Sequence, residues 1–306
     1  MSEVIQRPGL GWVRDLPSIL DYTISSDKVS AKLKALGQKD SIKDMLAQIG
    51  VAAPPKRLPA TTDLRQWCSP IEDQGSLGSC TAQAGAGMLE FYEKKAFNKY
   101  INASRLFLYK VTRNLLQWTG DTGAYLRTTM GALVLFGAPP EQYYPYIISK
   151  FDQEPPAFCY AFGQNYQAVS YYRLDPPGTT PEALLTRIKT NLAAGLPSMF
   201  GFTVYSSYTQ ANTTGKIPFP AKGETVVGGH AIMAVGYDDA MKIKNTNAGG
   251  VQTTGAILFR NSWGTGWGDQ GYGWLPYDYV LKRLAVDWWA LLKNEWVETG
   301  AFGLSG

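Results

Sequence analysis

A cysteine at the border between a loop and a run of small residues is the first candidate for chemistry. Residues 74–79 (QGSLGS) are rich in turn-forming glycine and serine, and residues 80–87 are small and compatible with a helix, so Cys80 begins a predicted helix. The unpaired N–H groups and the positive end of the helix dipole there favour a thiolate over a thiol. Because the thiolate is the stronger nucleophile, this position predicts a nucleophilic cysteine if the chain also supplies a base.

The chain contains a single histidine, His230, which follows Gly228 and Gly229 and precedes the apolar residues 231–235. A lone histidine beside an apolar strand is often a buried structural residue. The two glycines favour a functional role, because residues without a Cβ leave room for a substrate backbone. Imidazole is also the side chain that best takes a thiol proton near neutral pH. His230 is therefore the candidate base.

Two further side chains could complete such a site. Asn261, in residues 259–268 (FRNSWGTGWG), can accept the ring N–H that does not face sulfur, and Trp263 could cover that hydrogen bond and exclude water. Gln74 can donate its side-chain N–H to an oxyanion together with the backbone N–H of Cys80. Taken alone, the Asn-Ser-Trp-Gly sequence is typical of a turn with buried aromatics, and an isolated loop glutamine usually caps its own turn.

In their order along the chain, the segments 74–80 (QGSLGSC), 229–231 (GHA) and 261–268 (NSWGTGWG) resemble the papain family of cysteine peptidases. The resemblance covers about residues 61–285. It implies an α+β, papain-like fold, with a helical half, a β-barrel-like half and the active-site cleft between them. The roles it implies are nucleophile for Cys80, general acid/base for His230, imidazole orientation for Asn261, oxyanion donation for Gln74 and shielding of the Asn–His contact for Trp263.

The resemblance also suggests how a substrate is held. Gly123 resembles the family's glycine whose backbone pairs with the main chain of the substrate. Small residues around the expected S2 pocket leave a roomy apolar cavity, which predicts a bulky hydrophobic residue at P2. The predicted pocket residues are Gly123, Gly201, Gly228 and Ala231, and Gly229 and Trp263 complete the substrate-binding set.

Some positions depart from the family pattern. Leu77 stands where secreted members usually have a disulfide-bonded cysteine, Thr81 stands where a tryptophan is usual, and Gly229 replaces a frequent Asp or Asn. With residues 11–17, 63–65 and 104–109, these features resemble the disulfide-poor bacterial and archaeal branch. The three cysteines, Cys68, Cys80 and Cys159, are odd in number and lack CxxC spacing, so we expect free thiols in a reducing compartment.

The elements that must position these groups divide the chain into three parts: a prosegment-like region over residues 1–60, a helical half over 61–165, and a β-rich half with a C-terminal extension over 166–306. A Pro-rich, basic linker at 51–59 closes the first part. Helices are predicted at 79–96, 104–114, 125–136 and 180–195, and strands at 166–173, 198–205, 230–237, 256–261 and 271–276.

The first 60 residues have two interpretations. They form either a surface arm that packs on the core or a prosegment in which Trp12 and its apolar neighbours lie in the cleft and block Cys80. We favour the prosegment, because the family often works this way, although its longer helical prosegments differ. Cleavage is then expected in the exposed linker around residues 54–58.

Composition excludes several other classes of function. The chain has 306 residues, 45% of them hydrophobic and 18% charged, which is typical of a globular protein. A net charge of +4 without a dense basic cluster gives no case for nucleic-acid binding, and no apolar run is long enough to span a membrane. We expect no cofactor and no metal site. The N-terminus lacks a secretory signal, which favours a cytoplasmic location without excluding another export route.

The function expected from the sequence is therefore that of a cysteine-type endopeptidase. A Cys80 thiolate and a His230 imidazolium would form the resting pair, a thioester acyl-enzyme would follow, and the N-terminal segment would keep the zymogen inactive. The expected partners are a peptide or protein substrate and the chain's own N-terminal segment as inhibitor. Two alternatives use the same scaffold: an acyl transferase or peptide ligase with the same nucleophile, and a non-catalytic peptide-binding protein.

Overall fold

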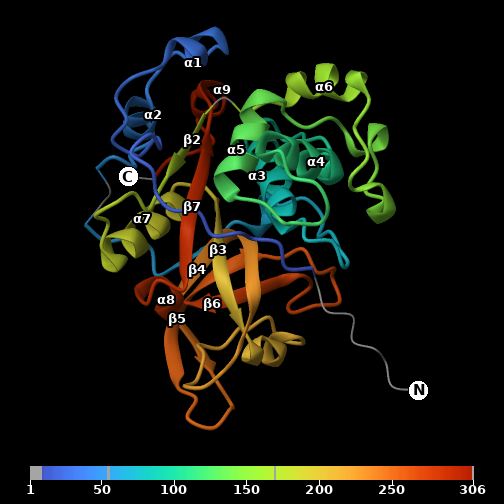
Figure 1. Cartoon of the computed structure of the whole chain (residues 1–306). Helices are drawn as coiled ribbons and strands as arrows, with labels where there is room; N and C mark the ends of the chain where they lie inside the picture. Colours follow the sequence, from blue (N-terminus) through green and yellow to red (C-terminus); the bar gives the residue numbers. More distant parts are fainter. Residues whose placement is uncertain (1–8, 54–55, 169, 305–306) are drawn as a thin grey trace.

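The computed structural model describes residues 9–53, 56–168 and 170–304, so Pro54 and Pro55 of the expected linker lie outside the described residues. Helices α3–α6 gather on one side of the molecule, and an antiparallel sheet forms the other (Figure 1). The predicted α+β class, with a helical and a sheet-built half, is confirmed.

The helical half is organised around α3, which begins at Cys80. Small residues allow its neighbours to approach closely: a Cβ on Gly85 would lie 3.0 Å from the Thr129 side chain. The neighbouring helix begins as predicted, because the Ser104 hydroxyl accepts a hydrogen bond from the Phe107 N–H at 3.2 Å. The helices of this half are α3 (Cys80–Phe97), α4 (Arg105–Leu116), α5 (Leu126–Leu135) and α6 (Ala157–Gly163).

The sheet has the strand order β2-β7-β3-β4-β5-β6, with β1 paired to β4, and every pairing is antiparallel. This path is open at β2 and β6, whereas the sequence suggested a barrel-like half. The helix α7 (Pro181–Ala193), with Thr180 as its N-cap, and the short α8 (Tyr277–Leu281) accompany the sheet. The strands are β1 (Thr61–Asp63), β2 (Ser170–Arg173), β3 (Ser198–Tyr205), β4 (Val226–Lys244), β5 (Gln252–Arg260), β6 (Tyr272–Pro276) and β7 (Ala285–Leu292).

Strand β7 is missing from the sequence prediction, which treated this part of the chain as an extension. Every residue of β7 is buried, and the strand pairs with both β2 and β3, next to the β2 end of the sheet. A strand buried on both faces has no alternation of polar and apolar residues, so the usual strand signal is absent. Strand β4 also begins earlier than predicted, at Val226 rather than His230.

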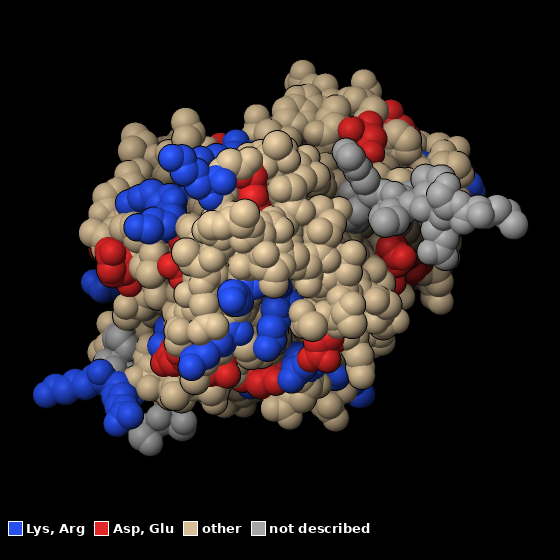
Figure 2. Space-filling model, turned by 90° about the horizontal axis from the view of Figure 1, so that it is seen from below, with Lys and Arg blue, Asp and Glu red and all other residues tan. Residues whose placement is uncertain are grey.

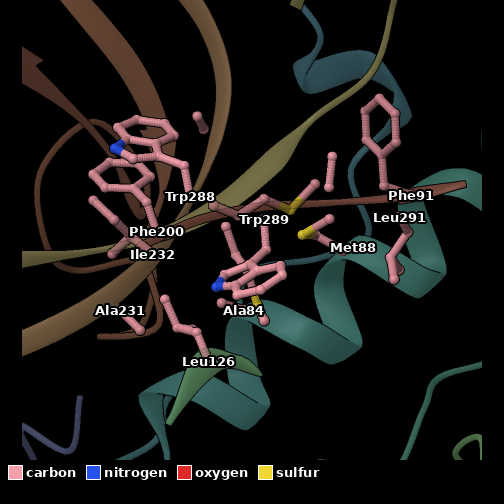
Figure 3. Close-up of a cluster of buried hydrophobic side chains, with 14 of the residues drawn as sticks. Ala84, Met88, Phe91, Leu126, Phe200, Ala231, Ile232, Trp288, Trp289 and Leu291 are labelled. Atoms are coloured by element: carbon pink, nitrogen blue, oxygen red, sulfur yellow. The ribbon is translucent and has the colours of Figure 1, made fainter. Parts of the chain in front are cut away.

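The main core lies where α3 packs against the sheet. Figure 3 shows Ala84 and Met88 of α3 close to Trp289 of β7, while the rings of Phe200 and Trp288 stack with centroids 3.8 Å apart. These side chains are buried, and each large aromatic ring removes extensive apolar surface from water. The packing holds the N-terminus of α3 against β4, which carries His230.

The N-terminal region contains two structurally different parts. Its second part forms α1 (Ala31–Ala35) and α2 (Ile42–Gln48), which has Ser41 as its N-cap and buries Met45 and Leu46. It also contacts the C-terminal helix α9 (Asn294–Glu298), because the Asn294 side chain accepts the Lys39 N–H at 3.0 Å. Its first part, residues 9–17, which we call the N-terminal arm, runs as an extended chain past the N-terminus of α3 (Figure 1).

On the face seen in Figure 2, Lys and Arg side chains stand among Asp and Glu side chains, with mostly uncharged surface between them. That face therefore presents no broad surface of a single charge sign. In the part of the chain that the structure describes, no helix combines the length and the apolar character needed to cross a bilayer.

Candidate active site

Cys80 is the first residue of α3 and is completely buried. The backbone N–H groups of Ala231 and Gly11, together with those of Thr81 and Cys80 itself, act on its sulfur and favour the thiolate. Ala231 directly follows His230 on β4, so the sulfur lies beside the strand that carries the histidine. The arm supplies Gly11, whose N–H also contacts the sulfur.

His230 is also completely buried, and its ring is held by two neighbours. Nε2 is 2.8 Å from Oδ1 of Asn261, and the Trp263 ring stacks on the imidazole with centroids 4.5 Å apart and an interplanar angle of 22°. Among the described residues, Nδ1 has no hydrogen-bond partner. Because Asn261 takes Nε2, Nδ1 is the nitrogen that remains to accept a proton from a thiol.

Asn261 follows the last residue of β5, and its side chain is fixed by more than the histidine. Oδ1 also accepts the N–H of Ser262 at 2.8 Å, and the Asn261 N–H donates to the Gly271 carbonyl at 3.0 Å. These bonds set the amide with its oxygen toward His230. An oxygen in that position selects the tautomer with hydrogen on Nε2 and leaves Nδ1 as the base.

Gln74 is oriented by a residue that the sequence analysis missed. The Ser262 hydroxyl donates to Oε1 of Gln74 at 2.6 Å, which turns Nε2 of Gln74 toward the carbonyls of Gly9 and Leu77, both at 2.8 Å. The Gln74 N–H also donates to the Ser262 carbonyl at 2.9 Å. The only signal for Ser262 was its place in the Asn-Ser-Trp-Gly segment.

The arm joins both halves of the molecule by backbone hydrogen bonds. The Trp12 N–H donates to the Gly229 carbonyl of β4 at 3.2 Å. On the helical side, the Ala124 N–H donates to the Gly11 carbonyl at 2.8 Å and the Val13 N–H donates to the Ala124 carbonyl at 3.1 Å. The arm therefore lies between the two halves and passes over Cys80.

The backbone of the arm pairs with Ala124, the residue after Gly123, and the expected pairing of Gly123 with a substrate main chain stays a prediction. Gly123 instead has φ +71°, and a Cβ there would lie 2.1 Å from the Gly11 carbonyl oxygen. A glycine is required because the backbone conformation is left-handed and a second chain passes directly over it. Gly123 thus provides the close approach, while its neighbour makes the hydrogen bonds.

The residues of the predicted S2 pocket contact different parts of the N-terminal arm and of the catalytic site. A Cβ on Gly201 would lie 1.9 Å from the Trp12 ring, and a Cβ on Gly229 would lie 2.8 Å from it, so these two glycines border the space that Trp12 fills. Gly228 faces Leu10 instead. Ala231 directs its N–H toward Cys80, and Trp263 covers His230.

The predicted pocket was apolar, whereas the one that holds Trp12 contains a carboxylate. Nε1 of Trp12 donates to Oδ2 of Asp287 at 3.1 Å, and both side chains are buried. Asp287 is not among the predicted pocket residues, because it lies in β7, the strand that was not predicted.

Burial changes the protonation state of Cys80 and His230. It raises the pKa of the Cys80 thiol to about 11, although the surrounding N–H groups lower it, and it lowers the pKa of His230 to about 4, although the hydrogen bond to Asn261 raises it. The raised pKa of the thiol and the lowered pKa of the imidazole both favour a neutral thiol beside a neutral imidazole. The sequence analysis expected a resting thiolate–imidazolium pair, which we now expect only after the arm leaves and water reaches the site.

The protonation state predicts slow alkylation of Cys80 in the full-length chain. A pKa raised from 9.0 to about 11 lowers the thiolate fraction near neutral pH by a factor of about 100. The rate of reaction with iodoacetamide, followed by peptide mass mapping, should therefore be low at pH 7 and rise as the pH approaches 11.

Cys68 is the internal control for that experiment, because its pKa is also raised to about 11 by burial and it does not contact the arm. Deleting residues 1–17 should accelerate alkylation of Cys80 and leave that of Cys68 unchanged. Equal rates for Cys80 with and without the arm would contradict the explanation. All three cysteines are free and buried, and the residues described contain no cluster of three or more potential metal ligands.

Comparisons with known proteins agree with this geometry. The model of the papain family of cysteine proteases matches residues 58–280. The chain belongs to the papain family and is a papain-like cysteine peptidase. The match includes Gln74, Cys80, His230 and Asn261, and it begins after the arm and the α1–α2 region.

Relatives extend the similarity beyond that range. An uncharacterised peptidase C1-like protein of Acanthamoeba polyphaga mimivirus is 33% identical over 293 residues, which cover 92% of this chain and 86% of the viral protein. Cathepsin K of Gallus gallus is 29% identical over 226 residues, 71% of this chain and 58% of its own. The crystal structure of xylellain, a cysteine protease from Xylella fastidiosa, superposes with a TM-score of 0.70 at 29% identity and covers 94% of this chain and 96% of its own.

Proposed function

We propose that this peptidase cleaves internal peptide bonds with Cys80 as the nucleophile and His230 as the general acid/base, and that its N-terminal arm keeps it inactive as a zymogen. The observation that carries the catalytic part is the hydrogen bond from Nε2 of His230 to Asn261, which leaves Nδ1 free on a strand beside the Cys80 sulfur. A base fixed in one tautomer next to a helix-terminal thiol is the arrangement that activates a cysteine.

The reaction begins once the arm has left the site. His230 takes the thiol proton at Nδ1, and the sulfur attacks the substrate carbonyl carbon. The resulting oxyanion accepts hydrogen bonds from Nε2 of Gln74 and the backbone N–H of Cys80, which replace the bond that Gln74 now makes to Gly9. His230 then protonates the leaving amine. A water molecule, deprotonated by the same imidazole, hydrolyses the thioester and regenerates the thiol.

The proposal that the arm is inhibitory rests on its contacts with Cys80 and Gln74. The Cys80 sulfur contacts the N–H of Gly11, which belongs to the peptide group between Leu10 and Gly11, whereas Nε2 of Gln74 binds the carbonyl of Gly9, which belongs to the preceding peptide group. The two groups that should act on one peptide bond therefore contact different peptide groups. The arm fills the site in a form that the nucleophile is not positioned to attack.

Labelling with a thiol-directed epoxide peptide tests the catalytic proposal. We expect the chain without residues 1–17 to be modified at Cys80 alone and to lose activity in proportion to the modification. A Cys68→Ala variant is the control and should be labelled at the same rate. Modification distributed over all three cysteines, or full labelling without loss of activity, would contradict the assignment.

A further inference from the structure

Asp287 gives the pocket that holds Trp12 a single hydrogen-bond acceptor at its buried end. The carboxylate is completely buried, and each of its oxygens has a distinct environment. Oδ1 accepts Nε1 of Trp289 at 2.8 Å and lies 3.2 Å from the guanidinium of Arg173. Oδ2 accepts Nε1 of Trp12 at 3.1 Å. The protein therefore uses Oδ1 for itself and leaves Oδ2 for whatever fills the pocket.

The acceptor needs only a neutral donor. Arg173, which contacts Oδ1 of Asp287 at 3.2 Å, also lies 2.9 Å from Asp175 and 3.6 Å from Asp21. A substrate lysine or arginine at Oδ2 would have to lose its hydration in a buried site, which is costly. An indole N–H satisfies Oδ2 without adding charge.

The shape of the pocket agrees with an indole. Gly201 and Gly229 lie against the Trp12 ring so closely that a Cβ would fall 1.9 Å from Cε2 or 2.8 Å from Cε3. Both glycines are paired within the sheet through β3 and β4, so the backbone on this side of the pocket is held in place. The space between it and Asp287 admits a wide, flat ring that carries a donor at its far edge.

We infer that this pocket selects a tryptophan side chain of the substrate, at P2, with Asp287 as the residue that recognises the indole N–H. The inference rests on the proposed peptidase function and sharpens the expectation of a bulky hydrophobic P2 residue. An apolar occupant without a donor would fill the space but leave Oδ2 buried and unpaired, which is the stronger penalty.

The test uses the full-length chain with Trp12→Ala, which empties the pocket while every other part of the chain is kept. Fluorogenic peptides carry Trp, 3-benzothienylalanine, Phe, Leu or Arg at P2. The benzothienyl ring keeps the shape of the indole and replaces N–H by sulfur, so we expect its kcat/KM to be about 10 to 100 times lower than that of the Trp peptide, as for a lost hydrogen bond to a charged group. Competition from the rest of the arm affects all peptides alike and leaves these ratios intact.

A second change, Asp287→Asn, tests the acceptor itself. Asparagine tolerates the positive φ of +64° at this position. Its one oxygen should stay with Arg173 and Trp289, so its NH₂ group would face the indole N–H and remove the preference. Asp21→Asn is the matched control, because Asp21 lies 3.6 Å from the same Arg173 but does not contact Trp12. In Asp21→Asn, the ratio of kcat/KM for the Trp peptide to kcat/KM for the benzothienyl peptide should equal the ratio measured for the Trp12→Ala chain.

The outcomes separate this inference from the proposed function. Equal kcat/KM values for the Trp and benzothienyl peptides, or an unchanged ratio in Asp287→Asn, would overturn the role of Asp287 while leaving the peptidase intact. If no peptide is hydrolysed either by this chain or by the chain without residues 1–17, the proposed function fails. Calorimetric titration of the same Trp and benzothienyl peptides into the Trp12→Ala chain then still decides the inference. We expect the Trp peptide to bind more tightly. Equal dissociation constants for the two peptides would overturn the role of Asp287.

Discussion

Replacing Cys80 by alanine in the chain without residues 1–17 should lower peptide hydrolysis by a factor of at least about 1,000, because a site that acts as a unit loses most of its rate with its nucleophile. His230 would keep its hydrogen bond to Asn261 but would have no thiol to deprotonate. The measurement is kcat/KM on a fluorogenic peptide, with circular dichroism to show that the fold is retained.

Cys68→Ala is the matched control, because Cys68 is a buried free thiol whose pKa is raised to about 11 by the same cause, burial. It contacts the Leu64 carbonyl and has no contact with His230. We expect wild-type activity from this variant. Wild-type hydrolysis by Cys80→Ala, or an equal loss in both variants, would refute the mechanism.

Removing the arm should have the second largest effect. The full-length chain should hydrolyse peptides slowly, and deletion of residues 1–17 should raise kcat/KM about 100-fold or more, since the arm contributes a buried tryptophan and several backbone hydrogen bonds to the closed state. Trp12→Ala alone should raise it about tenfold, because burial of one large side chain contributes about 1.5–3 kcal/mol.

The structure also indicates which residues to delete. A chain that begins near residue 60 would lose α2, whose Met45 and Leu46 are completely buried. In such a chain, the effect of lost inhibition could not be told apart from the effect of lost stability. Deletion of residues 1–17 keeps Asp21, which pairs with Arg127 at 2.7 Å. Ile19→Ala is the matched control, because that side chain is 95% exposed and its loss should change nothing.

A synthetic peptide covering residues 9–17 should inhibit the shortened enzyme when it is added separately. The corresponding peptide with Trp12 replaced by alanine should inhibit more weakly. Equal activity of the full-length and shortened chains would remove the inhibitory role and leave the arm as a structural segment.

The two interpretations of the N-terminal region predict different contacts, and the region makes contacts of both kinds. Residues 9–13 lie over the site, since Trp12 bonds to Asp287 and Gly11 contacts Cys80, and their inhibitory role stays a prediction. Residues 31–48 agree with the interpretation as an arm that packs on the core, because α2 buries its apolar residues there. The sequence did not distinguish these two parts of the N-terminal region, since both are short and moderately apolar and differ only in their contacts with distant residues.

The sequence by itself determined the family, the fold class and the helices with local start signals. Ser104, Thr180 and Ser41 each cap a helix through a hydrogen bond to a residue three positions along the chain, so the relevant partner is already visible in the sequence. Cys80, His230, Asn261 and Gln74 were proposed from residue types and from short segments whose chemistry is specific. The structure links His230, Asn261 and Gln74 by hydrogen bonds through Ser262, and it places the Cys80 sulfur beside the N–H of Ala231, the residue after His230.

Only the tertiary structure decided which residues face the substrate side of the site. Asp287 reaches the Trp12 pocket from β7, 275 residues further along the chain, and Ser262 reaches Gln74 across 188 residues. The pairing of the arm with Ala124 rather than Gly123 depends on the path of a second segment. Contacts of this kind arise from the packing of buried strands such as β7, whose residues are all buried, so that its sequence lacks the alternation of polar and apolar residues that would identify a strand in advance.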